Sequence, residues 1–194
     1  MSITMNEAQP LAAIRQLAET RSPVLVAIDG RCAAGKTTLA NRWSVAFGWN
    51  VVHLDDFFLR PEQRSPQRYA VPGENVDHER FLAEVLDPLR MGQMPVYRPF
   101  DCHTMALTEP RTIPLAPIVL VEGSYACHPD LWDRYDLRLF VTVDPDEQLR
   151  RILTRNGPDA ARVFQDRWIP LEERYFAAYQ VQERCDFCLE IDRH

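Results

Sequence analysis

Short, continuous apolar runs alternate along the chain with stretches of helical periodicity. Residues 24–28 and 118–121 are apolar at every position, as is typical of parallel strands that are buried on both faces. The pattern predicts three further strands, at residues 51–54, 137–143 and 187–191.

Between these runs, apolar residues recur at the spacing of a helix. Pro88 is expected to end one of the helices, and Pro170 to interrupt the last one. Because strands and helices alternate, the chain is predicted to form an α/β domain with a central parallel sheet and helices on both faces. The expected helices cover residues 7–19, 36–47, 77–89, 145–155 and 161–183.

Two proline-rich regions depart from this alternation. Residues 60–75 are predicted to form a long loop, and within residues 95–117 the pairs Val96-Tyr97 and Thr112-Ile113 could form a small hairpin. Long irregular segments inside a compact domain are often functional. We therefore expect one domain, residues 1–194, with an insertion at about residues 60–117.

Charge and cysteine usage narrow the function classes. The net charge of −6 disfavours binding to nucleic acid or to an anionic membrane surface, although a local site for a small anion remains compatible with it. The odd number of cysteines, five, favours reduced thiols. Residues 1–10 lack the basic and apolar runs of a signal peptide. These features predict a cytoplasmic protein, and they leave a homo-oligomer open.

Lys36 is the only lysine among the 22 basic residues. It belongs to a stretch that fits G-x-x-x-x-G-K-[ST] at every fixed position, after an expected buried strand and before an expected helix. In such a loop the backbone N–H groups surround a phosphate, the lysine reaches the β- and γ-phosphates, and the hydroxyl that follows is offered to Mg²⁺. The nucleotide-binding residues are expected to be Gly30, Arg31, Cys32, Ala33, Ala34, Gly35, Lys36, Thr37 and Thr38.

The rest of the sequence limits the type of phosphate-loop protein. A guanine-specific switch protein needs an N-K-x-D element, and a second lysine to build one is absent. The second apolar strand ends at Glu122 and not at the aspartate found in many motor and transporter ATPases. A kinase that acts on a small molecule agrees best with these features.

Acidic residues follow two of the expected strands. Asp55 and Asp56 come after residues 51–54, and Glu122 ends residues 118–122. In an open parallel sheet, ligands bind beyond the carboxyl ends of the strands, so these acids should face the phosphate loop. A carboxylate there can accept the proton of an attacking hydroxyl or help to hold Mg²⁺.

Three arginines lie on the expected helix 145–155, before a break at residues 156–158 that suits a mobile lid. Arg150, Arg151 and Arg155 could neutralise the charge of a transferring phosphoryl group. A solvated helix face that pairs with Asp146 and Glu147 is the alternative. The lid is expected at about residues 150–170.

Taken together, these elements resemble the uridine/cytidine kinase-like family of P-loop kinases, which also includes nicotinamide riboside kinase, pantothenate kinase and phosphoribulokinase. The matching elements occur in the family's order through most of the chain. They are residues 30–37, 55–58 (Asp-Asp-Phe-Phe), 75–78 (Asn-Val-Asp-His), 95–97 (Pro-Val-Tyr), 122–123 (Glu-Gly) and 150–151 (Arg-Arg).

The resemblance implies a P-loop α/β/α sandwich and a role for each matching residue. Asp55 corresponds to the family's catalytic base and Mg²⁺ partner, and Glu122 to the residue that assists the metal together with Thr37. ATP and Mg²⁺ are the implied cofactors, and Lys36, Arg151 and Arg155 are implied to act on the transferring phosphoryl group. The implied acceptor-binding residues are Asp56, Asp77, Tyr97 and His103.

The implied reaction is transfer of the ATP γ-phosphoryl group to a primary hydroxyl, first of all that of a nucleoside. Residues 95–104 are two residues longer than the family's P-x-Y-D-F-x-x-H-x-R element and lack its final arginine. Acceptors of the nicotinamide riboside or pantothenate type therefore stay open. A nucleotide-binding regulator without turnover is the alternative from another class.

Overall fold

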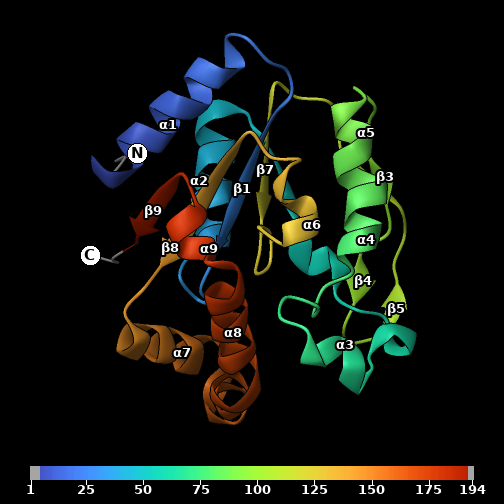
Figure 1. Cartoon of the computed structure of the whole chain (residues 1–194), viewed down its shortest axis with the longest axis vertical. Coiled ribbons are helices and arrows are strands. Elements are labelled where there is room, and N and C mark those ends of the chain that lie inside the picture. The colour runs from blue at the N-terminus through green and yellow to red at the C-terminus, as the bar shows by residue number, and fades with distance from the viewer. Residues whose placement is uncertain (1–4, 192–194) are drawn as a thin grey trace.

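The computed structural model describes residues 5–191, which form a three-layer α/β/α domain around a five-stranded sheet (Figure 1). The strand order is β2-β7-β1-β8-β9, and every neighbouring pair is parallel. Both predictions, the α/β class and the parallel sheet, are confirmed. The strands are β1 (Val24–Gly30), β2 (Asn50–His53), β7 (Ile118–Glu122), β8 (Leu137–Thr142) and β9 (Phe187–Glu190).

The central strands are buried on both faces because each face is covered by helices. On one face, α1 (Met5–Ala18) and α2 (Lys36–Phe47) pack against side chains that alternate along β1, such as Val24 and Val26. On the other face, Leu25 and Ala27 contact the layer that contains α4, α6, α8 and α9. Alternate side chains of one strand thus fill two separate cores.

The predicted helix over 77–89 is confirmed: helical residues run from α4 (His78–Phe81) through a π-helical turn to α5 (Asp87–Arg90), and the helix ends two residues after Pro88. The expected interruption at Pro170 is wrong in position. A π-helical turn at Phe164–Trp168 precedes Pro170, which lies in the first turn of α8 (Ile169–Tyr179). In both cases the proline occupies the first turn after the π turn, where its missing N–H costs least.

The last helical region breaks instead at Gln180, which adopts a left-handed conformation between α8 and α9 (Val181–Arg184). The helix that contains the arginines breaks where the sequence predicts: α7 covers Pro145–Val163, but its backbone is non-helical at Gly157, where two helical segments meet in a kink. Within residues 5–191, none of the helices combines the length and the apolar character needed to cross a bilayer.

The predicted loop at residues 60–75 is partly helical, because Pro61–Gln63 and α3 (Pro66–Ala70) each begin with a proline. Proline is favourable at the first position of a helix. The predicted hairpin forms, but its second strand is one residue earlier than the predicted pair 112–113. Val96 of β3 (Val96–Tyr97) pairs with Thr112, and Tyr97 with Arg111, of β6 (Arg111–Thr112). An unpredicted second ribbon joins β4 (Phe100–Asp101) to β5 (Ala106–Leu107). The remaining helix is α6 (Pro129–Trp132).

Asp29 is a fully buried acid near the end of β1, and it connects three elements. Its Oδ1 accepts the N–H groups of Gly30 (2.6 Å) and Tyr125 (3.2 Å). Its Oδ2 accepts the N–H of Cys127 (2.8 Å) and the hydroxyl of Tyr175 on α8 (2.9 Å). The carboxylate therefore holds β1, the segment after β7 and helix α8 together beneath the phosphate loop.

The predicted single domain includes residues 1–4 and 192–194, which lie outside the described residues.

Candidate active site

The phosphate loop joins β1 to α2 and depends on close packing at its first glycine. A side-chain carbon on Gly30 would lie 2.0 Å from the carbonyl oxygen of Val141 in β8, and the glycine has φ +130°. Only glycine combines this backbone conformation with so close an approach. The loop can therefore turn directly over the carboxyl ends of the strands, and α2 begins at Lys36, immediately after Gly35.

Lys36 points back into the loop. Its Nζ donates to the carbonyl oxygens of Gly30 (2.6 Å) and Arg31 (2.9 Å) and lies 3.5 Å from Ser124 Oγ. The side chain is buried, and it has no carboxylate partner among the described residues. A single ammonium with only neutral oxygen partners supplies positive charge that an anionic ligand can use.

Glu122, at the end of β7, is held by two neighbours. Thr37 donates its hydroxyl to Oε2 (3.0 Å), and His53 Nδ1 lies 2.5 Å from Oε1. The hydrogen bond to Glu122 raises the pKa of His53, while burial of the ring opposes the rise. The carboxylate is thereby oriented beside the threonine at the start of α2.

Asp55 lies in a 3₁₀ turn (Leu54–Phe57) that follows β2. The residue is solvent-accessible, and its carboxyl group faces a partly open cavity whose protein walls surround it. Burial raises its pKa to about 6; the positive charge of Lys36 opposes this rise, and the carboxylate of Glu122 adds to it. Together, Thr37, Asp55 and Glu122 offer oxygen donors, which are the ligands that Mg²⁺ prefers.

Gly123 permits the approach of the Asp55 turn to β7. A side-chain carbon there would lie 2.9 Å from Leu54 Cβ and 3.4 Å from Asp55 Oδ1, at φ +149°. We expect Gly123→Ala to displace Asp55, the base that the family resemblance implies, and to lower kcat on the order of tenfold to a hundredfold, because small displacements of reacting groups are costly. Steady-state kinetics test this, and Gly92→Ala, at a glycine of positive φ with open space around it, is the matched control. Equal kcat in the Gly123 variant and the wild type would contradict the prediction.

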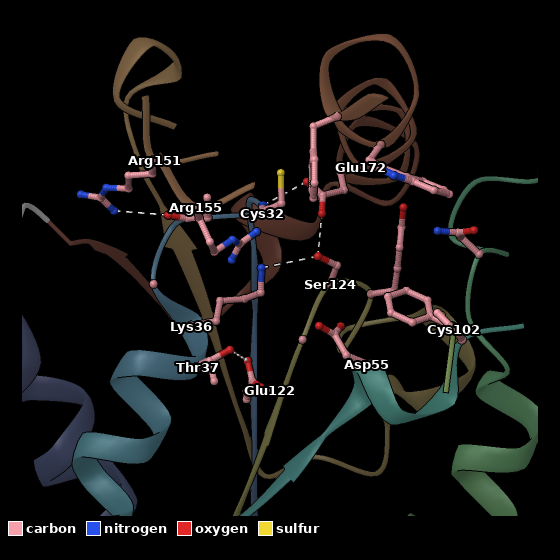
Figure 2. A pocket seen from close by; sticks show the side chains of 18 of the residues that line it. Cys32, Lys36, Thr37, Asp55, Cys102, Glu122, Ser124, Arg151, Arg155 and Glu172 are labelled. Carbon is pink, nitrogen blue, oxygen red and sulfur yellow. Dashed lines mark hydrogen bonds between the residues drawn. The ribbon is translucent and has the colours of Figure 1, made fainter. Parts of the chain in front are cut away.

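A cavity of about 760 Å³ contains these groups. Figure 2 shows Arg151 and Arg155 on one side and Cys102 on the other, with Lys36 and Asp55 between them. The volume is within the range of small-molecule sites. The part of the cavity that lies beyond Asp55, away from the arginines, is lined mostly by aromatic and neutral side chains. Arg64 is the one charged side chain among them. This side is lined by Phe58, Leu59, Arg64, Tyr69, Asn75, Cys102, Met105, Tyr125 and Trp168.

Most residues that the sequence predicts to bind the nucleotide, the metal or the transferring phosphoryl group line the cavity. They are Cys32, Ala33, Gly35, Lys36, Thr37, Thr38, Asp55, Glu122, Arg151 and Arg155. Arg31 forms an ion pair with Glu173 on α8 instead (2.5 Å). Arg151 pairs with Glu147 (2.7 Å) and also donates to carbonyl oxygens, including that of Ala33 in the loop. It therefore combines both predicted alternatives, an ion pair on the helix surface and a position over the phosphate loop.

The four residues predicted to bind the acceptor lie outside the cavity lining. Asp56 accepts hydrogen bonds from Tyr97 and Arg111 (both 2.8 Å), which anchors the hairpin of β3 and β6. Asp77 is buried and caps α4 by accepting the N–H of Arg80. His103 is exposed in the turn between β4 and β5. Their roles in acceptor binding stay predictions.

Several lining residues are missed when the sequence motifs alone are used. Ser124 follows the Glu-Gly pair directly and could have been inferred from its position. Asn75 belongs to the matching 75–78 element, but its side chain, and not that of Asp77, reaches the cavity. Trp168 and Glu172 come from the C-terminal helices, more than 100 residues after the loop, and only the fold brings them to it.

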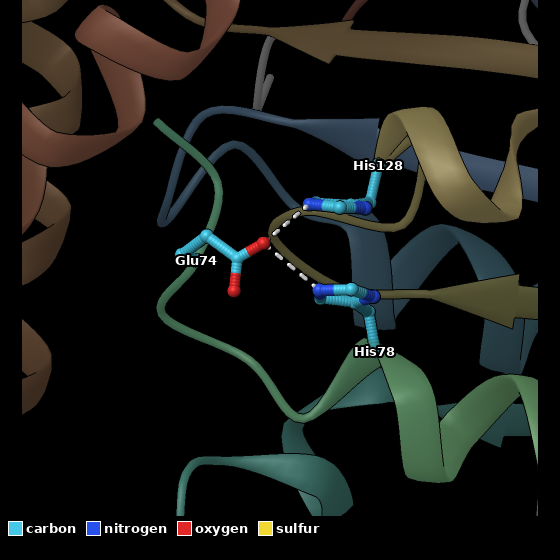
Figure 3. A group of neighbouring side chains, drawn as sticks. All are labelled: Glu74, His78 and His128. Atoms are coloured by element: carbon cyan, nitrogen blue, oxygen red, sulfur yellow. Dashed lines mark hydrogen bonds and ion pairs between the residues drawn. The ribbon is translucent and has the colours of Figure 1, made fainter. Parts of the chain in front are cut away.

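A second cluster, Glu74, His78 and His128, lies beside the segment that carries Asn75 (Figure 3). Glu74 Oε1 lies 3.0 Å from His78 Nε2 and 3.7 Å from His128 Nε2. The two rings are stacked with centroids 4.0 Å apart, and His128 Nδ1 accepts the N–H of Asp130 (3.2 Å). Neutral His128 therefore carries its proton on Nε2, and parallel rings do not converge on one ion. The cluster fits a hydrogen-bonded support for residues 74–77 better than a metal centre.

Burial, with the neighbouring His78, lowers the pKa of His128 to about 4, below the usual value of 6.5. A neutral buried histidine stabilises the fold above the unfolded-state pKa, and this contribution is lost as the pH falls from about 6.5 toward 4. We expect the contribution of His128 to lower the free energy of unfolding by about 2 kcal/mol when the pH falls from 7 to 5. His128→Asn, which keeps the capping acceptor, should lack this part of the pH dependence in urea unfolding. Equal losses in both proteins would contradict the assignment.

The site has the features of the P-loop class of nucleotide-binding proteins. These are a buried strand followed by a loop bordered by glycines, a lysine at the start of the next helix, and two carboxylates at the ends of neighbouring strands. Comparison with known proteins narrows the class. No protein-family model matches the chain. The chain is 30% identical over 151 residues to a uridine kinase of Deinococcus deserti, and this match covers 72% of each protein. The chain belongs to the uridine kinase-like family of P-loop kinases.

Two further similarities agree with this family. The chain is 29% identical over 143 residues to a uridine kinase of Chlamydia pneumoniae, and this match covers 69% of the chain and 64% of that protein. The chain thus spans less than two thirds of that relative's length. A solved structure described as a possible uridine kinase from Bacillus stearothermophilus superposes with a TM-score of 0.65 at 19% identity, over 93% of this chain and 99% of the other. At this identity the likeness supports the fold alone.

Proposed function

We propose that the protein is an ATP-dependent kinase that transfers the γ-phosphoryl group to a primary hydroxyl of a small metabolite. The observation that carries this proposal is the position of Asp55. Its carboxyl group opens to the same cavity as Lys36 and the phosphate loop, next to the neutral polar and aromatic side that could receive an acceptor. Membership of the uridine kinase-like family supports the same activity.

Binding of ATP would use the groups that surround the loop. The backbone N–H groups of the loop and the start of α2 face an anion, and Lys36 can exchange its carbonyl partners for phosphate oxygens. Arg155, and Arg150 and Arg151 from the same helix, line the cavity and can offset the charge of the transferring group. Thr37, Asp55 and Glu122 would hold Mg²⁺, which would neutralise charge on the phosphates.

Asp55 would act as the base. With a pKa of about 6 it is mostly ionised at neutral pH and is close to the range in which a carboxylate accepts a proton efficiently. It would take the proton of the acceptor hydroxyl as that oxygen approaches the γ-phosphorus. Since phosphoryl transfer requires little covalent chemistry from the protein, positioning and charge compensation supply most of the catalysis.

The first acceptor to consider is a nucleoside, because the relatives in the family are named uridine kinases. Within this proposal, residues 60–117 form the acceptor-binding insertion and residues 150–170 the lid of a single domain. Asn75, Tyr69 and Trp168 are the nearest candidates for acceptor contacts, because they line the cavity. Nicotinamide riboside and pantothenate are the alternative acceptors.

Acceptor-dependent ADP release tests the proposal. The purified protein is incubated with ATP and Mg²⁺ and, separately, with nucleosides, nicotinamide riboside or pantothenate. At least one acceptor should raise ADP formation above the rate without acceptor. If ATP binds and no acceptor raises ADP formation, the kinase proposal is contradicted and a nucleotide-binding regulator becomes the better description.

A further inference from the structure

Glu172, on α8, places a carboxylate directly on the phosphate loop. Its Oε2 accepts the backbone N–H of Cys32, the third residue of the loop, at 3.0 Å. Its Oε1 accepts the hydroxyl of Ser124 at 2.6 Å. The residue is only 4% exposed, and both contacts join it to groups that line the cavity (Figure 2).

The same carboxylate is one hydroxyl away from Lys36. Ser124 Oγ donates to Glu172 and lies 3.5 Å from Lys36 Nζ, so the three groups form a chain. The backbone N–H groups and the lysine of this loop are the donors that bind nucleotide phosphates. Glu172 thus holds a backbone donor of the phosphate loop and brings a carboxylate within one hydroxyl of Lys36. A γ-phosphate bound at Lys36 would lie close to this carboxylate, and the two anionic groups would repel each other.

Helix α8 also contacts the acceptor side of the cavity, by which we mean the part lined by Tyr69, Asn75 and Trp168. Arg174, two residues after Glu172, donates to the carbonyl oxygens of Tyr69 (2.8 Å) and Ala70 (3.0 Å). Tyr69 and Trp168, the residue directly before α8, both line that side. A shift of α8 at Glu172 would therefore move contacts at the acceptor side as well.

From this arrangement we propose that Glu172 is an internal anion that occupies part of the phosphate site when no nucleotide is bound. The γ-phosphate of ATP displaces it, and α8 transmits this displacement to Tyr69 and Trp168. Glu172 is then a positioning residue that weakens nucleotide binding and couples it to acceptor binding. This inference rests on the proposed function for the identity of the ligand, ATP.

The test is nucleotide affinity in Glu172→Gln, measured by calorimetry without acceptor. The amide keeps an oxygen for the Cys32 N–H and the size of the side chain, so the fold should be retained, while the charge is removed. We expect ATP to bind roughly tenfold more tightly than to the wild type, a typical size for coupling between sites. ADP, which lacks the γ-phosphate, should gain less. In turnover assays KM for ATP should fall without a loss of kcat.

Glu183→Gln is the matched control, because it removes the same charge from an exposed position on the neighbouring helix α9, outside the cavity lining. Glu173 is unsuitable, because it pairs with Arg31 of the phosphate loop. Replacement of Glu183 should leave ATP affinity close to that of the wild type. The inference is overturned if Glu172→Gln binds ATP no more tightly than the wild type, if both variants tighten binding equally, or if Glu172→Gln lowers kcat instead of KM. Absence of ATP binding by the wild type would contradict the proposed function itself.

Discussion

Replacement of Asp55 by asparagine should lower kcat for phosphoryl transfer by roughly two to four orders of magnitude while ATP still binds. The amide keeps the size and one oxygen of the carboxylate, but it cannot accept the proton of the acceptor hydroxyl. The phosphate loop and Lys36 do not depend on Asp55 for their contacts, since Lys36 donates to loop carbonyl oxygens. Steady-state kinetics and calorimetry with ATP measure the two effects separately.

Asp56→Asn is the matched control for this prediction. It removes the same charge from the adjacent residue, but the Asp56 carboxylate faces Tyr97 and Arg111 and lies outside the cavity lining. We expect turnover to fall far less than in the Asp55 variant. Near-normal turnover in Asp55→Asn, or equal losses in both variants, would remove Asp55 from the role of the base.

The second large effect is expected at Asp29. Asp29→Ala leaves four donors without their acceptor inside the fold, three backbone N–H groups and the hydroxyl of Tyr175. Each unsatisfied buried polar group costs about 1 to 3 kcal/mol, although a water molecule that enters the space can recover part of the loss. We expect the free energy of unfolding to fall by roughly 3 to 5 kcal/mol, measured by urea denaturation.

Asp159→Ala serves as the control, because Asp159 is exposed on α7. Its free energy of unfolding should remain within about 0.5 kcal/mol of the wild-type value. A loss below about 1 kcal/mol for Asp29→Ala would show that the carboxylate does not hold β1, the segment after β7 and α8 together.

The features that the sequence predicts well are local and continuous. The strands at β1 and β7 are read from runs in which every residue is apolar, and the phosphate loop from fixed spacing within a few residues. The general position of Asp55 and Glu122 follows from a topological rule, because parallel strands end at one edge of the sheet. The same rule explains why both line the cavity that contains Lys36 in the structure.

What could not be predicted depends on long-range packing. The longer segment at 95–104 folds in part as a second ribbon, whose turn holds His103 in an exposed position. Asp77 turns inward to cap α4, so its neighbour Asn75 reaches the cavity instead. Glu172 has no local motif, and its contact with Cys32 spans 140 positions. The last helical region continues past Pro170 because a π turn precedes it.

The most direct test of the account is to follow the phosphoryl group itself. Wild-type protein, ATP, Mg²⁺ and the best acceptor from the panel are incubated, and the acceptor is analysed by mass spectrometry alongside ADP. We predict that the acceptor gains one phosphoryl group for each ADP formed, and that Asp55→Asn yields neither product at a comparable rate. Release of ADP together with inorganic phosphate and an unmodified acceptor would contradict the account.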